Sequence, residues 1–414
     1  MNKKKLYYFS QNLISLFTVK GVELALTLGL IPYLLVKVGV ANYGNYAFAM
    51  AMILFFVNVL NYGFDLSAVR DLAANKNDSL KMNQLFNEVF SVKLFLLGIA
   101  YCIIFIVVLF VPRFIENRMI YLLASLLLIG DLFSLRWFFL GLEKMKFITV
   151  ISFLSTLIYV GLVLVFIQRK SDFIWIPLTE AVALFVVSGI SFLWVLKQFK
   201  IKIQLLSLEQ TIMYLKSHFY SYVNLLLPST SGVLIVFLMG LFGFPNNVAF
   251  MQLGIKFTFA FSTVNTVLTT VFYPMVNREQ KNRIPSRIAL MGMGLFLSVV
   301  MFVGSDYLIV HWLKFENKID LDNTLAVIQY LSPVPFLMGV ISSYGINGLL
   351  VYFEDKLYSW ITITSTLFMI ILACLLIPRF TIIGGAIAFV AARVIYALLS
   401  YYFFKMKLNL DETH

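Results

Sequence analysis

The stretch LFLLGIAYCIIFIVVLFV, residues 94–111, contains eighteen residues and no charged side chain. An α-helix needs about 20 mostly apolar residues to cross the hydrocarbon core of a bilayer. Together with the residues before it, this stretch is long enough for such a helix, and we expect the helix to cover residues 85–111. Similar apolar runs follow one another along the chain, so the sequence predicts a membrane protein.

Composition supports this interpretation over the whole length. Of the 414 residues, 61% are hydrophobic and 13% are charged, whereas about a quarter of an average soluble domain is charged. We therefore expect an all-α polytopic membrane protein with about twelve transmembrane helices. The expected spans are residues 10–35, 43–64, 85–111, 119–140, 148–167, 174–196, 218–243, 248–274, 287–310, 324–348, 358–377 and 382–404.

The distribution of Lys and Arg between the short loops predicts the orientation of the chain. With the N-terminus inside, nineteen Lys and Arg residues fall on the inner side and eight on the outer side. Positive residues are enriched in cytoplasmic loops. Both termini are therefore expected in the cytoplasm, with an even number of spans.

A polar segment at residues 201–217 divides the chain into an N-lobe, residues 1–200, and a C-lobe, residues 218–414. Ser207 and Gln210 fit a capping box, and apolar residues recur after them at helical spacing. We interpret this cytoplasmic linker as a short helix lying on the inner membrane surface. A plain polar connector is the alternative.

The two lobes resemble each other weakly. The stretch at 39–44 (GVANYG) joins spans 1 and 2, and the stretch at 243–248 (GFPNNV) joins spans 7 and 8, which places the repeat offset at 204 residues. The same offset relates Asn61 to Asn265. Six spans return the chain to its starting side, so the repeats would be parallel and related by an axis along the membrane normal.

Several function classes are not favoured by the sequence. The net charge of +12 is spread over short loops and forms no basic face, so no nucleic acid partner is expected. Cys102 and Cys374 lie in apolar runs, and the histidines form no cluster, so no metal site is expected. We find no nucleophile–base set and no large outer loop, and hence expect no enzyme.

Ionisable residues inside the expected spans are the candidates for function. At the helix centre each costs roughly 2.5–3.5 kcal/mol on insertion scales. The candidate lumen or substrate-binding cations are Arg393, Lys256, Lys20, Arg136 and Lys93. The candidate ion-coupling or charge-pairing anions are Asp131, Glu23 and Glu180. The excess of cations favours a cavity that accepts an anion.

Each of these residues also has a structural interpretation. Lys20 and Glu23 lie at i, i+3 on one helix face and can neutralise each other. Lys93 and Arg136 can extend their aliphatic stems to the interface. Glu180 can pair with a neighbouring cation. Arg393 and Asp131 are too deep to reach the interface easily, which leaves a structural ion pair or a role in the lumen.

Two loop motifs carry a resemblance to a known family. The first is NYGFDLSAVRDL at 61–72, and the second is RWFF at 136–139 followed by GLEKMK at 141–146. Both resemble bacterial O-antigen flippases of the polysaccharide transporter group. That group belongs to the multidrug, oligosaccharidyl-lipid and polysaccharide exporter superfamily. A weaker third similarity is GGAIA at 384–388.

The resemblance implies two six-helix lobes that work by alternating access. The implied substrate is an undecaprenyl-pyrophosphate-linked oligosaccharide for O-antigen and lipopolysaccharide, moved from the cytoplasmic to the periplasmic leaflet of the bacterial inner membrane. It also implies an ion gradient, H⁺ or Na⁺, with no bound cofactor, and a polysaccharide polymerase and chain-length regulator as partners. A multidrug or cation antiporter of the same superfamily is the alternative, and it should carry more acidic lumen groups. A lipid II flippase would usually have two further spans.

The first motif also supplies candidates for a cytoplasmic gate. Asp65, Arg70 and Asp71 lie where the second span meets the cytoplasm. They can form and break charge pairs as a gate, or they can anchor the loop at the lipid headgroups.

Overall fold

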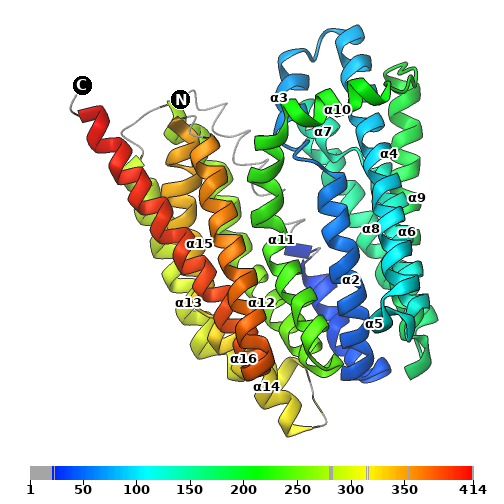
Figure 1. Cartoon of the computed structure of the whole chain (residues 1–414), viewed down its shortest axis with the longest axis vertical. Helices are drawn as coiled ribbons and strands as arrows, with labels where there is room; N and C mark the ends of the chain where they lie inside the picture. The colour runs from blue at the N-terminus through cyan, green and yellow to red at the C-terminus, as the bar shows by residue number, and fades with distance from the viewer. Residues whose placement is uncertain are drawn as a thin grey trace. The chain divides into compact units, whose positions relative to one another are not determined.

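The computed structural model describes residues 21, 22, 24–278, 283–313, 315, 317–352 and 355–412 (Figure 1). Over these ranges the chain is helical and contains no strand. Eight of the described helices are long and apolar enough to cross a membrane, and shorter apolar helices cover Leu24–Val38 and Leu226–Phe242. The expected all-α polytopic fold is confirmed.

The chain forms two compact units. Unit 1 comprises Met1–Gly39 and Ile53–Tyr222, and unit 2 comprises Val40–Met52 and Val223–His414. The units differ in two places from the division expected at residues 200 and 218. The linker at 201–217 belongs to unit 1, and the first half of the second expected span belongs to unit 2. The linker is hydrogen-bonded to α4 (Ser79–Phe110) of unit 1, and the start of α2 (Val40–Leu60) packs against Pro245 of unit 2.

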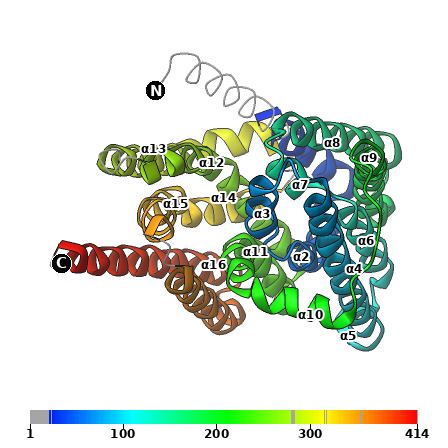
Figure 2. The ribbon, with the colours of Figure 1, turned by 90° about the horizontal axis from the view of Figure 1, so that it is seen from above.

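Unit 1 is a bundle of antiparallel helices with short helices at one end. After α2 (Val40–Leu60), its elements are α3 (Ser67–Ala74), α4 (Ser79–Phe110), α5 (Pro112–Ile115), α6 (Arg118–Leu132), α7 (Arg136–Gly141), α8 (Met145–Phe166), η1 (Lys170–Trp175), α9 (Ile176–Gln198) and α10 (Leu208–Ser217). Helix α6 packs on α4 and α9, and α9 also packs on α8. The short helices α3, α7 and α10 lie together at one end of this bundle (Figures 1 and 2).

Unit 2 has the same kind of architecture. Its elements are α11 (Phe219–Phe242), α12 (Pro245–Arg278), α13 (Arg283–Leu313), α14 (Lys318–Leu331), α15 (Val334–Ile341), η3 (Ser342–Ile346), η4 (Leu349–Tyr352) and α16 (Asp355–Glu412). Helix α15 packs between α13 and α16 (Figure 2). The first residues of α2 join this unit because Gly44 lies against the backbone of Pro245, where a Cβ would come within 1.8 Å of the carbonyl oxygen.

Two expected spans are interrupted. The span at 119–140 is broken between α6 and α7, and the span at 324–348 is broken between α14 and α15. At the second break, Pro333 has no N–H to continue the helix. The expected spans at 358–377 and 382–404 are both inside α16, which turns at Thr381 (φ 47°, ψ −122°), three residues after Pro378.

Small residues let α13 and α15 approach closely. A Cβ on Gly294 would lie 2.7 Å from the Pro335 carbonyl oxygen, and one on Gly339 would lie 2.5 Å from that of Leu290. Close backbone approach through small residues is the usual way that membrane helices gain packing energy, since the lipid offers no hydrophobic driving force between them.

Candidate functional site

Lys93 and Asp131 form a buried ion pair in unit 1. The Lys93 ammonium lies 3.2 Å from Asp131 Oδ2, and the two side chains are 2% and 10% exposed. Lys93 also donates to the main-chain carbonyls of Asp131 at 2.7 Å and Ser134 at 3.5 Å. The expectation that Lys93 reaches the interface is wrong, because its side chain is enclosed and paired.

The position of this pair explains the break between α6 and α7. Asp131 lies in the last turn of α6, where carbonyl groups lack helical partners and carry partial negative charge. The Lys93 ammonium donates to the Asp131 carbonyl of this turn and to the Ser134 carbonyl just after it, and it neutralises the carboxylate. The pair therefore stabilises an interrupted helix and leaves little net charge for a substrate.

Two asparagines occupy equivalent places in the two units. Asn61 donates to Asp131 Oδ1 at 3.4 Å, and Asn265 donates to the Pro335 carbonyl at 2.8 Å. Each contact joins residues 70 apart in sequence, and each ends at the break in the fourth helix of its repeat. The offset of 204 residues that relates Asn61 to Asn265 also relates Asp131 to Pro335, so the internal repeat extends to tertiary contacts.

Arg393 lies in the interior of unit 2. The residue is 4% exposed, its guanidinium donates to Ser231 Oγ of α11, and its Cζ lies 5.1 Å from the centroid of the Phe389 ring. Nearby, Tyr396 donates to the Tyr358 hydroxyl at 2.6 Å. Within the described part of the chain, no carboxylate forms an ion pair with Arg393.

Lys256 is the second candidate cation in unit 2. It is half-buried on α12, with its ammonium 5.9 Å from the centroid of the Tyr43 ring. Tyr43 is fully buried, and its hydroxyl has no hydrogen-bond partner within the described ranges. This arrangement offers a cation–π contact in place of a carboxylate.

The remaining candidates are Arg136, Glu180, Lys20 and Glu23, and none of them is a buried residue of the described chain. The guanidinium of Arg136 pairs with Asp65 at 3.2 Å, and the two side chains are 60% and 40% exposed. Arg136 is therefore at the surface of unit 1 and does not lie among buried groups. Glu180 is half-buried on α9. Lys20 and Glu23 lie outside the described residues.

The gate candidates form a network of ion pairs at the end of unit 1. Besides the pair between Asp65 and Arg136, Asp71 lies 3.7 Å from Arg70 and 3.8 Å from the His218 imidazole. His218 follows α10, so this network joins the first loop motif to the linker. All of these groups are partly exposed, so each pair contributes little to stability and can break at small cost.

The two loop motifs pack against each other. Gly141 of α7 lies against Leu72 of α3, where an added Cβ would meet the Leu72 side chain at 2.8 Å. Lys76 and Glu143 form an exposed ion pair at 3.3 Å beside this contact. The family-like residues of the two motifs therefore form one structure at one end of unit 1.

Tyr62 is a residue of this structure that sequence reasoning missed. It has φ 34° and is followed by Gly63 at φ 71°, so the chain turns sharply after α2. The strain of the left-handed Tyr62 is offset by its side chain, which donates to the Leu215 carbonyl at 2.7 Å and stacks on Tyr222 with ring centroids 4.1 Å apart.

The linker is clamped to α4 by side chains at positions 83, 87 and 91. Asn83, Asn87 and Ser91 accept hydrogen bonds from the backbone amides of residues 202, 204 and 206 at 2.8, 2.8 and 3.0 Å. Four residues of the helix α4 rise about 6 Å, and two residues of the extended linker span about 6.6 Å. Every fourth residue of α4 therefore meets every second residue of the linker. The spacing of i, i+4, i+8 places these three polar residues on one face of α4, and this was the signal available in the sequence.

Helix α10 begins as the sequence predicts. Ser207 Oγ accepts from the Gln210 amide, and the Gln210 side chain accepts from the Ser207 amide, which is the predicted capping box. Exposed apolar residues of the linker and α10 include Leu205, Leu208 and Met213. Their contact with a membrane surface stays a prediction.

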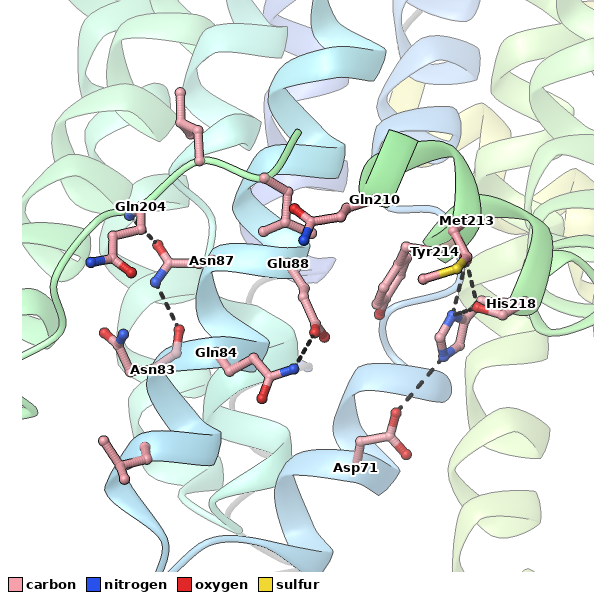
Figure 3. A pocket seen from close by; sticks show the side chains of 14 residues that line it. Asp71, Asn83, Gln84, Asn87, Glu88, Gln204, Gln210, Met213, Tyr214 and His218 are labelled. Atoms are coloured by element: carbon pink, nitrogen blue, oxygen red, sulfur yellow. Dashed lines mark hydrogen bonds and ion pairs between the residues drawn. The ribbon is translucent and has the colours of Figure 1, made fainter. Parts of the chain in front are cut away.

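A pocket of about 740 Å³ lies between α3, α4 and α10 (Figure 3). Its lining includes Asp71, Glu88, Gln84, Tyr214 and His218 and contains no Lys or Arg. Figure 3 shows Glu88 turned toward Gln84 and Asp71 toward His218. Because its charged lining is acidic, this pocket does not suit a phosphate group.

Metal binding finds no support in the described part of the chain, where no group of three His, Cys, Asp or Glu side chains could hold an ion.

The fold and these buried charges define a polytopic membrane protein with the architecture of the lipid flippases and multidrug transporters. The structure matches lipid II flippase MurJ in an inward closed conformation with a TM-score of 0.74 and 16% sequence identity, over 94% of this chain and 87% of that one. It matches an inward-facing MATE multidrug transporter with a TM-score of 0.66 and 14% identity, over 94% and 99% of the two chains. At such identities the match concerns the fold alone.

The chain belongs to the polysaccharide biosynthesis protein family, whose model matches residues 9–280. A protein of Escherichia coli (strain K12), provisionally named an O-antigen transporter, is 27% identical over 401 residues, or 95% of each chain. One of Shigella dysenteriae with the same provisional name is 24% identical over 233 residues, covering 53% of this chain and 58% of that one. The resemblance to O-antigen flippases is thus confirmed. The third motif, at 384–388, lies beyond the family match.

Proposed function

We propose that the protein is a flippase that moves an undecaprenyl-pyrophosphate-linked oligosaccharide from the cytoplasmic to the periplasmic leaflet by alternating access. Family membership, the O-antigen transporter relatives and the flippase-like fold support a lipid-linked saccharide as the substrate class. We further propose the bacterial inner membrane as its location, with both termini in the cytoplasm and with a polymerase and a chain-length regulator as partners.

The observation that carries the proposal is the environment of Arg393. A buried guanidinium without a carboxylate partner in the described part of the chain is costly in a membrane protein. A pyrophosphate would offset that cost, since guanidinium groups bind phosphate oxygens with charge-assisted, bidentate hydrogen bonds. Ser231 and Phe389 orient the group. In this proposal Arg393 is the main phosphate contact and Lys256 a second cation.

The buried acids do not favour the alternative of a cation antiporter. Asp131 is neutralised by Lys93, and the buried ionisable group with no such partner in the described part of unit 2 is cationic. Transport still requires an energy source, and we propose coupling to a gradient of H⁺ or Na⁺. No described residue distinguishes the two ions.

The test is a deletion strain that carries plasmid copies of the gene. The wild-type gene should restore surface polysaccharide, and the deletion should accumulate the lipid-linked repeat unit in the cytoplasmic leaflet. Proteoliposomes with a labelled lipid-linked oligosaccharide should show protein-dependent exposure of the label to a membrane-impermeant reagent. Normal surface polysaccharide in the deletion strain, together with increased sensitivity to cationic drugs, would instead establish the antiporter.

A further inference from the structure

A groove on the surface of unit 2 is lined by neither Arg393 nor Lys256. It has a volume of about 480 Å³ and lies between α13, α15 and η3. The lining consists of Ile284, Arg287, Ile288, Met291, Gly292, Leu295, Phe336 and Tyr344. The α13 residues among them follow the pattern i, i+3, i+4, i+7, i+8, i+11, so they lie on one face of the helix.

Arg287 is the charged residue of this groove, one turn from the start of α13. Its Cζ lies 4.3 Å from the centroid of the Phe404 ring and 5.2 Å from that of Tyr344. Contact with two rings restricts the guanidinium to the end of the groove nearest the α12–α13 loop. The sequence before it contributes further basic residues at positions 278, 281 and 283, and such juxtamembrane clusters attract anionic lipids.

The rest of the groove is apolar and extends over most of the depth of one leaflet. Ile284, Ile288 and Leu295 are 67%, 68% and 53% exposed, so their side chains are open to the surroundings of the protein. The eight-residue step from Arg287 to Leu295 corresponds to about 12 Å of helix. Half of the hydrocarbon core of a bilayer measures about 15 Å. Gly292 leaves a gap along this face, since a Cβ there would meet no atom within 4 Å.

We propose that this groove binds one anionic phospholipid, with its phosphate at Arg287 and one acyl chain along α13 past Gly292. Arg287, the cation that lines the groove, matches one phosphate, and the apolar length beyond it matches much of one acyl chain. An undecaprenyl chain is too long for a groove of one leaflet's depth, which argues against the transport substrate as its occupant. The α12–α13 loop is cytoplasmic in the expected topology, so the lipid would come from the inner leaflet. The proposal stands independently of the transported substrate.

Native mass spectrometry of the purified full-length protein tests it. The protein is delipidated in mild detergent and titrated with phosphatidylglycerol or, separately, with phosphatidylcholine of the same chain length. We expect one tightly retained phosphatidylglycerol and no equivalent phosphatidylcholine. Loss of one charge-assisted contact should weaken phosphatidylglycerol binding by about tenfold or more in Arg287→Gln, whereas Arg287→Lys should keep part of it.

A second variant tests the binding of the lipid acyl chain separately from that of the phosphate headgroup. Gly292→Leu should fill the gap, lower retention of phosphatidylglycerol and leave the protein folded, because Leu is a better helix former than Gly. Gly161→Leu is the matched control, since Gly161 on α8 also has open space at its Cβ and lies in unit 1. It should bind lipid like the wild type.

Three outcomes would overturn the proposal. The first is equal retention of the two phospholipids by the wild type. The second is unchanged phosphatidylglycerol binding in both Arg287→Gln and Gly292→Leu. The third is displacement of phosphatidylglycerol by one equivalent of undecaprenyl phosphate, which would assign the groove to a polyprenyl lipid.

Discussion

The ammonium of Lys93 lies 3.2 Å from the carboxylate of Asp131, and this pair fills the break between α6 and α7. Sequence alone places both residues inside the membrane but does not pair them. Because Lys93 and Asp131 neutralise each other, neither is a candidate for binding a charged substrate. A substitution at either position should therefore affect the stability of the protein.

Asp131→Leu should destabilise the protein strongly, because it leaves the Lys93 ammonium buried without its partner. Removing one member of a buried pair typically costs about 3–5 kcal/mol. The double variant Lys93→Met with Asp131→Leu should recover most of this loss. Thermal unfolding of the detergent-solubilised proteins measures both effects. A stable but inactive Asp131→Leu protein would instead indicate a role of the carboxylate in transport.

Asn265→Ala should destabilise unit 2, because it leaves the buried Pro335 carbonyl without its donor. The expected cost is about 1–3 kcal/mol, read from the same thermal unfolding measurement. Asn61→Ala should cost less, since Asn61 is half-buried and its contact to Asp131 is longer, at 3.4 Å. Equal or reversed costs would contradict the importance that we assign to burial at these two positions.

Asn87→Ala should loosen the linker from α4. It removes two hydrogen bonds, from the Gln204 amide and to the Lys202 carbonyl. At about 1 kcal/mol each, trypsin cleavage after Lys202 should become roughly tenfold or more faster. Gln84→Ala is the matched control, because Gln84 contacts Glu88 on its own helix. Similar cleavage rates for the two variants would show that the clamp does not hold the linker.

Arg393→Ala should abolish surface polysaccharide in the complementation assay while the amount of protein in the membrane stays normal. Arg393→Lys keeps the charge but loses the planar pair of donors, and it should retain a small part of the activity. Arg379→Ala changes an exposed arginine near the turn in α16 and should be fully active. Full activity of Arg393→Ala would remove this residue from the proposed phosphate site.

Reporter fusions test the orientation. A reporter fused after Lys170 should lie in the periplasm and one fused after Lys200 in the cytoplasm, because α9 (Ile176–Gln198) separates the two positions. An alkaline phosphatase fusion should be active only at the first site and a fluorescent protein fusion only at the second. The reverse pattern would invert the expected topology and place the linker outside.

The amino-acid sequence was sufficient to predict the class of protein, most of its apolar segments and the α10 capping box. These properties depend on local hydrophobicity, on helix length against bilayer thickness and on neighbouring side chains. The tertiary structure decided which charges are neutralised. It buried Lys93 against Asp131, brought Arg136 to the surface beside Asp65, and enclosed Arg393 with Ser231. Those outcomes depend on contacts between residues 38 to 162 positions apart, and no local pattern encodes such pairings.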